Sequence, residues 1–214
     1  MACGVFPILD YVFWILLAFA SGSIPWAFII GRLFLQKDIR SIGDGNPGTA
    51  NAWKMGGHIP GTVSLLLELG KGAIPLYIAF RFLAFPSTTI SEALHATLLL
   101  SPILGHAWSP LLKFHGGKAI AVTGGVWLII LGWVSIPIAI LLLGLGHATQ
   151  RNHAITVTAT LIGLFLTSLI TNFYPYIFLF GIVNLLILCY KHRGEYSEGF
   201  ILRGWLDRVR KVVS

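Results

Sequence analysis

Four long runs without Asp, Glu, Lys or Arg constrain the fold of this 214-residue chain more than any other feature. They cover residues 11–31, 93–112, 119–150 and 152–190. A helix needs about 20 apolar residues to cross the roughly 30 Å hydrocarbon layer of a bilayer, and each run is that long. Only 11% of the residues are charged, whereas soluble domains carry about 25%. The chain is therefore predicted to be an all-α integral membrane protein.

The first run is expected to remain in the mature protein. A cleavable signal peptide begins with basic residues, but the first Lys or Arg here is Arg32, which follows the run. The two cysteines, Cys3 and Cys189, are expected near opposite membrane faces, which excludes a disulfide between them.

A fifth apolar segment, residues 59–83, is also counted as a span although it contains Glu68 and Lys71. These two residues are three positions apart, so they share a helix face and can pair. An ionisable pair at membrane depth must face protein or water and is a candidate functional site.

Residues 119–146 are too long for one upright helix. A single crossing there would export the basic C-terminal tail, which the positive-inside rule disfavours. Two short spans are therefore predicted, with a break near Gly132, Trp133 and Pro137. The run 152–190 is expected to divide at residues 171–175.

The resulting prediction is one polytopic domain, residues 1–214, built as a bundle of seven transmembrane helices with short cytoplasmic loops. The N-terminus is expected outside and the tail 191–214 in the cytoplasm, because most of the 15 Lys and Arg residues then lie inside and only Arg81 clearly lies outside. The net charge of +7 does not indicate a nucleic-acid partner, since the basic residues flank apolar spans and form no stripe on a folded surface.

Three polar segments are predicted to meet on the cytoplasmic face. In the first, residues 38–54, the glycines Gly43, Gly45 and Gly48 let the backbone turn its N–H groups inward, and such a nest can bind an anion. An ordinary turn explains a glycine cluster equally well.

The second polar segment ends in Gly116, Gly117 and Lys118 at the start of a predicted helix. Backbone N–H groups, the helix dipole and the ammonium then all favour a phosphate, although the spacing is not that of a Walker A loop. Alternatively, Lys118 is only an inside-positive anchor. His106 and His115 alone would be typical of interfacial packing.

The third polar segment is the tail that begins Lys191-His192-Arg193. A basic segment next to a span usually anchors to anionic lipid, which accounts well for residues 203–211. It accounts less well for His192 and Arg193, which adjoin the apolar span.

Several chemistries are absent from the sequence. No His and Cys residues have metal-ligand spacing, and neither Gly-x-Ser-x-Gly nor His-x-x-x-x-Asp occurs. No metal or cofactor is expected.

In order and spacing, the polar segments resemble those of the bacterial acyl-phosphate-dependent glycerol-3-phosphate acyltransferases (PlsY type), which are seven-span enzymes of the cytoplasmic membrane. The resemblance covers nearly the whole chain. It rests on Ser23-Ile24-Pro25, Asp38-Ile39-Arg40, residues 43–51 with Lys54, Glu68-Leu69-Gly70-Lys71-Gly72, and residues 105–118.

The resemblance implies acyl transfer from acyl phosphate to the 1-hydroxyl of glycerol 3-phosphate, giving lysophosphatidate and phosphate for phospholipid synthesis. Gly116, Gly117 and Lys118 would cradle glycerol phosphate, and Lys54 and Asn46 would steady the acyl-phosphate oxyanion. Acyl phosphate is already activated, so no strong protein base is required. The other partners implied are membrane lipid and the enzymes that supply acyl phosphate.

The residues expected to take part form two groups. The catalytic group is Lys54, Lys118, His192, Asn46 and Asp44. The substrate-binding group is Gly43, Gly45, Gly48, Asn51, His106, Gly116, Gly117, Lys71, Glu68 and Arg193.

The chain departs from the family pattern at functional positions. Asp44 replaces Ser and is expected to repel a phosphate, by on the order of 4 kcal/mol at 4 Å with an effective dielectric constant of 20. Ala119 replaces Gly, which is tolerable only with a negative φ. In the tail, Glu195 replaces Asn and Glu198 replaces Arg.

These departures leave two alternatives open. One is a non-catalytic or altered-acceptor relative that binds anionic lipid or phosphate ligands. The other is a transporter that uses Glu68 and Lys71 as an intramembrane relay, although the two halves of the chain show no inverted repeat.

Overall fold

Apolar helices account for most of the computed structural model, which describes residues 6–171 and 173–205. The predictions that concern Cys3, Asn172, Arg208, Arg210 and Lys211 lie outside these residues. The α-helices are α1 (Phe6–Ser23), α2 (Trp26–Leu35), α3 (Thr49–Gly56), α4 (His58–Phe82), α5 (Thr89–Ala107), α6 (Ile120–Leu131), α7 (Ser135–Thr149), α8 (His153–Thr171) and α9 (Pro175–Lys191). Short 3₁₀ turns occupy Ile39–Ser41, Pro110–Leu112, Gly132–Val134 and Tyr196–Glu198.

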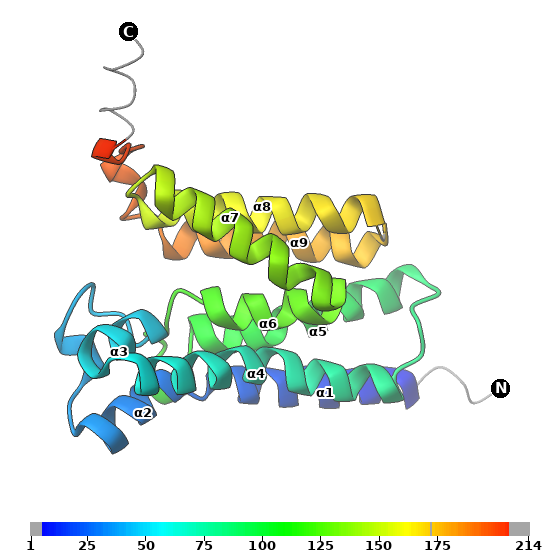
Figure 1. Cartoon of the computed structure of the whole chain (residues 1–214). Helices are drawn as coiled ribbons and strands as arrows, with labels where there is room; N and C mark the ends of the chain where they lie inside the picture. The colour runs from blue at the N-terminus through cyan, green and yellow to red at the C-terminus, as the bar shows by residue number, and fades with distance from the viewer. Residues whose placement is uncertain (1–5, 172, 206–214) are drawn as a thin grey trace, which may run out of the picture.

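The helices form two layers, with α1, α4, α5 and α6 in one and α7, α8 and α9 in the other (Figure 1). Within the layers, α1 packs on α5, α4 on α6 and α7 on α8. Trp127 of α6 joins the layers: its ring lies 5.3 Å from that of Phe180, and its Nε1 donates to Asn184 Oδ1 at 3.2 Å. Trp127 and Phe180 are fully buried, so this contact forms the centre of the core.

The outer surface is apolar to an extent that water would not tolerate. Leu16, Trp133 and Ile170 are 63%, 80% and 85% exposed, among many other large apolar side chains. Within residues 6–171 and 173–205, four helical stretches are long and apolar enough to cross a membrane by length and composition: Ile8–Leu35, His58–Phe82, Ile120–Thr149 and His153–Thr171. The structure thus agrees with the prediction of an all-α membrane protein, with the surface facing lipid.

The polar connections gather at one end of the bundle. The α2–α3, α5–α6 and α7–α8 connections and the segment after α9 lie there, whereas the α4–α5, α6–α7 and α8–α9 connections lie at the other end (Figure 1). Arg81, near the C-terminal end of α4, lies at this second end. The three polar segments singled out in the sequence are therefore neighbours in space.

The stretch 119–149 divides as predicted. α6 stops at Leu131, Gly132 turns the chain with φ +59°, and α7 runs back along the bundle (Figure 1). Pro137 does not cause the break, because it lies in the first turn of α7, where a proline lacks no needed donor.

The first apolar run, which was predicted to be one span, contains a break between two helices. α1 ends at Ser23 and α2 starts at Trp26, because Pro25 has no N–H and forces Ile24 out of the helical region. Hydropathy does not register this break, since the run remains apolar on both sides of it.

Glu68 and Lys71 of α4 supply the polar partners that this break requires. Lys71 Nζ donates to the Ile24 carbonyl at 2.7 Å, and Glu68 Oε1 accepts the Ala27 N–H at 3.2 Å. The pair itself is 2.7 Å apart, and His106 Nδ1 lies 2.8 Å from Lys71 Nζ. Both side chains of the pair are 1% exposed, so the pair works as an internal clamp between α1, α2, α4 and α5.

We expect Lys71→Met to destabilise the protein by about 3–5 kcal/mol, because it leaves the buried Glu68 carboxylate without a cation. The melting temperature of the detergent-purified protein should fall by about 6 °C or more. Glu68→Gln combined with Lys71→Met should recover part of this loss, and Lys37→Met, at an exposed position, serves as the control. A melting temperature for Lys71→Met that matches the wild type would refute the clamp.

Candidate active site

The first polar loop points a carboxylate inward. Gly43 and Gly45 have φ values of +62° and +72°, and Asp44 lies between them. Asp44 Oδ1 accepts the Asn46 N–H at 3.2 Å and Asn51 Nδ2 at 2.9 Å. A Cβ on Gly43 would approach Asn51 Oδ1 to 2.4 Å, so glycine is required there for both conformation and space.

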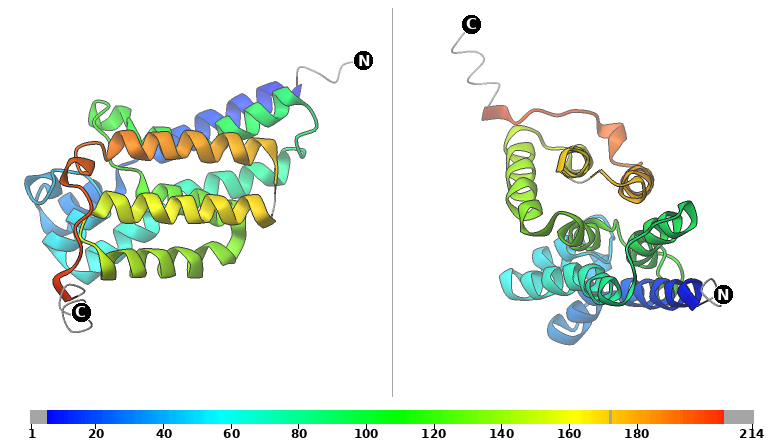
Figure 2. Two further views of the ribbon diagram at one scale, coloured as in Figure 1. Left: turned by 90° about the horizontal axis from the view of Figure 1, so that it is seen from above. Right: turned by 90° about the vertical axis from the view of Figure 1, so that its right-hand side faces the viewer.

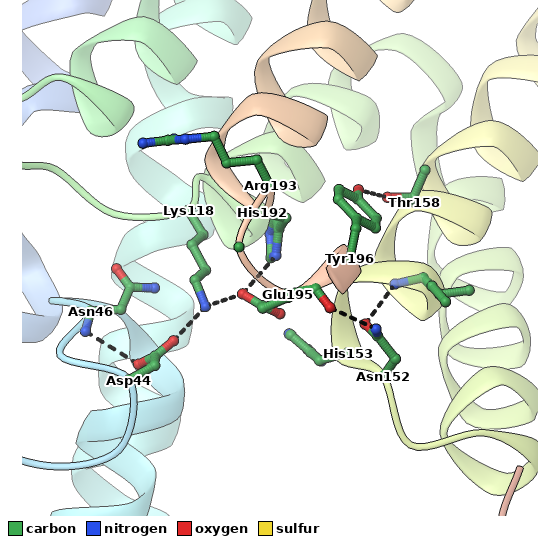
Figure 3. Close-up of polar contacts among 12 residues, drawn as sticks. Asp44, Asn46, Lys118, Asn152, His153, Thr158, His192, Arg193, Glu195 and Tyr196 are labelled. Carbon is green, nitrogen blue, oxygen red and sulfur yellow. Dashed lines mark hydrogen bonds and ion pairs between the residues drawn. The ribbon is translucent and has the colours of Figure 1, made fainter. Parts of the chain in front are cut away.

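Lys118 joins this loop to the tail (Figure 3). Its Nζ lies 2.5 Å from Asp44 Oδ2 and also pairs with Glu195 Oε1. Asp44 and Glu195 are the acidic replacements noted in the sequence, and both contact the same ammonium. One ammonium therefore faces two carboxylates and offsets only part of the negative charge that Asp44 brings to the site.

These contacts fix the charges of the cluster. Burial by itself would raise the pKa of Asp44, but bonds from Lys118, the Asn46 N–H and Asn51 lower it to about 2. Burial also opposes ionisation of Glu195, yet Lys118 and His192 lower its pKa. The two carboxylates in turn raise the pKa of Lys118. Near neutral pH the cluster holds two anions and one cation.

His192 contacts the cluster through Glu195. Its Nδ1 lies 3.2 Å from Glu195 Oε1, and its side chain is fully buried at the end of α9. Burial lowers the pKa of His192, so the ring is neutral and Nδ1–H donates to Glu195. Its Nε2 has no hydrogen-bond partner among residues 6–171 and 173–205. Because the ring is buried, His192 positions Glu195.

A main cavity of about 680 Å³ opens beside Lys118. One part of its wall is formed by Asp44, Asn46, Gly48, Lys54, Lys118 and Glu195. The cavity is also bordered by Glu68 and His106. The opposite part comes from the α7–α8 turn and the tail, through His147, Arg151, His153, Glu198 and Arg203.

A second cavity of about 590 Å³ lies next to the first. It is lined by Arg40, Gly45, Trp108, His115, Gly116, Lys191 and Arg193. Asp44, Asn46 and Lys118 line both cavities. Lys118 thus stands at the boundary between two spaces that each contain basic side chains.

The predicted site residues separate into four groups. Lys54, Gly48, Glu68 and His106 border the main cavity, whereas Gly45, Gly116 and Arg193 border the second. Asp44, Asn46 and Lys118 border both. Gly43, Asn51, Lys71, Gly117 and His192 line neither cavity and support those that do.

Gly117 does not offer its N–H to a ligand in this structure. The N–H donates to the His106 carbonyl at 3.1 Å, and a Cβ on Gly117 would approach His106 Nε2 to 2.3 Å. Gly116 is equally tight, with its own Cβ position 2.0 Å from that carbonyl. The two glycines therefore let the loop pack on the end of α5, which places Lys118.

Sequence reasoning missed the far wall of the main cavity. His147, Arg151 and His153 flank a short turn between two apolar runs, where they read as ordinary helix-end residues. Arg203 was assigned to a lipid anchor. No spacing in the sequence signals that the tail returns to this turn.

Ala119, next to Lys118, contradicts the condition set for it. Its φ is +63°, in the left-handed region, and its side chain is 2% exposed. An alanine in this conformation is strained by about 1–2 kcal/mol. The chain keeps the glycine-type turn ahead of α6 after losing the glycine.

The family model described as glycerol-3-phosphate acyltransferase matches residues 12–200. Glycerol-3-phosphate acyltransferase 1 of Thermotoga maritima is 37% identical over 196 residues, covering 86% of this chain and 94% of that protein. The glycerol-3-phosphate acyltransferase of Endomicrobium trichonymphae is 30% identical, covering 85% of this chain and 88% of that protein.

Crystal structures show the same fold. That of PlsY, an integral membrane glycerol 3-phosphate acyltransferase, in its glycerol 3-phosphate form has a TM-score of 0.77 with 23% identity, and covers 93% of this chain and 98% of its own. Its lysophosphatidic acid form has a TM-score of 0.75 with 24% identity, and covers 87% and 90%.

We expect Ala119→Gly to stabilise the protein, because relief of the left-handed strain exceeds the loss of one buried methyl group. The gain should be about 1 kcal/mol, or a rise of about 2–4 °C in the melting temperature. Ala121→Gly, two residues into α6, should lower stability by about 1 kcal/mol instead. Equal destabilisation by both substitutions would show that position 119 is unstrained.

Proposed function

The chain belongs to the glycerol-3-phosphate acyltransferase family, and we propose that it transfers a fatty acyl group from acyl phosphate to the 1-hydroxyl of glycerol 3-phosphate. The products are lysophosphatidate and inorganic phosphate, and the reaction feeds phospholipid synthesis. The observation that supports this most is the position of Lys118 on the shared wall of two basic cavities. Such an arrangement suits a reaction between two phosphate-bearing substrates, because one ammonium can contact both.

Glycerol 3-phosphate suits the second cavity, which Gly116, Arg40 and Arg193 border. Acyl phosphate suits the main cavity, where Lys54 and Asn46 face it. Ile120 and Ala121 also line the main cavity, so an acyl chain can leave along the apolar start of α6. Lys118 then lies where the two phosphate-bearing ends meet.

In this arrangement the 1-hydroxyl oxygen attacks the carbonyl carbon of acyl phosphate. The bond from that carbon to the phosphate oxygen breaks, and the hydroxyl proton passes to a phosphate oxygen. Lys118 and Lys54 stabilise the negative charge that develops on the carbonyl oxygen and the leaving phosphate. His192 takes no part in proton transfer, because its ring is buried behind Glu195.

We propose seven crossings by α1, α4, α5, α6, α7, α8 and α9 of the bacterial cytoplasmic membrane, within one domain. The end that carries the two cavities faces the cytoplasm, with the N-terminus outside, because the basic residues concentrate at that end. Acyl phosphate would then be received from cytoplasmic or membrane-associated enzymes that make it.

We expect purified protein to release phosphate from palmitoyl phosphate in a manner that depends on glycerol 3-phosphate. Lys118→Ala should lower kcat by about 10²–10³, as loss of one charge-stabilising donor does in other enzymes. The exposed Lys37, at the same end of the bundle, provides the matched control Lys37→Ala, which should keep its activity. Release that is independent of the acceptor would contradict the proposed reaction.

We also expect Asp44→Ser to tighten substrate binding. In the free protein the Asp44 carboxylate occupies Lys118, and it repels an incoming phosphate. Because Asp44 is 44% exposed, the effect is screened by solvent, and we expect KM to fall by about two- to fivefold for at least one of the two substrates. Asp10→Ser, on α1, is the control for the change of net charge. A higher KM for glycerol 3-phosphate would instead indicate an acceptor that carries a cationic group.

A further inference from the structure

The chain after α9 returns across the end of the upper layer. Residues 195–205, called here the C-terminal strap, pass from α9 over the end of α8 to the end of α7 (Figure 2). The Arg151 N–H donates to the Ile201 carbonyl at 2.8 Å, and the Arg203 N–H donates to the Thr149 carbonyl at 2.9 Å. The strap therefore pairs with the α7–α8 turn through a single antiparallel bridge between Gln150 and Leu202.

Side chains also hold the strap. Asn152, which is 2% exposed, donates from Nδ2 to the carbonyls of Glu195 and Gly199 at 2.8 and 3.0 Å. The hydroxyls of Thr158 and Tyr196 lie 2.6 Å apart (Figure 3). These partly buried contacts tie the strap to α8, and they fix the register of its residues.

This register places two arginines on the far wall of the main cavity. Arg151 and Arg203 both line it, Arg151 from the α7–α8 turn and Arg203 from the strap. Both side chains are exposed, and neither forms an ion pair within the described part of the chain. Lys118, by contrast, is occupied by Asp44 and Glu195. The two guanidinium groups are thus available to an anion that enters the cavity.

The strap also explains a change of charge in the tail. Position 198, where the resemblance called for arginine, carries Glu198, which lines the same cavity. The match to the family model ends at residue 200, so Arg203 lies beyond it. Arg203, five residues later, therefore brings a cation to the same cavity from a segment outside the family match.

We propose that Arg151 and Arg203 bind the phosphate group of the substrate in the main cavity. The ligand is a phosphate monoester or acyl phosphate dianion, whose oxygens match the forked donors of a guanidinium. The assignment of a substrate to this cavity rests on the proposed function. Acyl phosphate is the expected ligand, and glycerol 3-phosphate is the other source of the same group.

Steady-state kinetics with palmitoyl phosphate and glycerol 3-phosphate test this. Arg203→Gln should raise KM for palmitoyl phosphate about tenfold, the size expected for a lost charged hydrogen bond, and change kcat less than twofold. Arg203→Lys should recover part of the loss, and Lys37→Gln should have no effect. The strap should survive, because the Arg203 backbone N–H still bonds Thr149. If only the KM for glycerol 3-phosphate rises, the main cavity binds glycerol 3-phosphate and not acyl phosphate. The phosphate site at Arg151 and Arg203 would still stand.

A binding measurement separates this inference from the proposed function. Palmitoyl phosphate without acceptor should raise the melting temperature of the purified protein, and Arg203→Gln and Arg151→Gln should each reduce that rise. If acyl transfer is absent but the rise still requires both arginines, the proposed function fails and the phosphate site stands. If acyl transfer occurs while both variants keep the wild-type KM values and the full rise, the phosphate site is refuted.

Discussion

The rest of this structure depends on one buried ion pair. Glu68 and Lys71 would be costly to remove from water alone, but each is paired with the other and with a backbone group left free where α1 ends and α2 begins. The pair also holds His106, whose carbonyl receives the Gly117 N–H. Through these contacts a single turn of α4 positions the α1–α2 break and the loop that carries Lys118.

The charges of the site depend on one another, because Lys118 pairs with both Asp44 and Glu195. In the sequence, Asp44 and Glu195 are two separate departures from the residues that the family resemblance implies. One lies in the first loop and the other in the tail. In the folded chain they meet on Lys118. Either carboxylate alone would be balanced by the ammonium, and the two together leave an excess of negative charge at that point. A phosphate must therefore exchange with them, aided by the cations around it.

The sequence predicted those parts of the structure that are set by local chemistry. Apolar run length gave the helices, and Gly132 marked the reversal between α6 and α7. Pro25 held the information for the α1–α2 break, but hydropathy concealed it, and the bonds from Glu68 and Lys71 that satisfy the break join segments over 40 positions apart. Arg203 could not be placed at all, since its position depends on pairing between the strap and the α7–α8 turn.

The strap suggests how a diverged chain can retain a phosphate site. Glu195 and Glu198 add negative charge to the tail, and both line the cavity for which we propose a phosphate ligand. Arg151 and Arg203 add positive charge to the same wall from a pairing held by the backbone and Asn152. The backbone hydrogen bonds of this pairing do not depend on the side chains of residues 201 and 203, so these side chains can change while the wall remains in place. The electrostatics of the site can therefore be redistributed without altering the helices that support it.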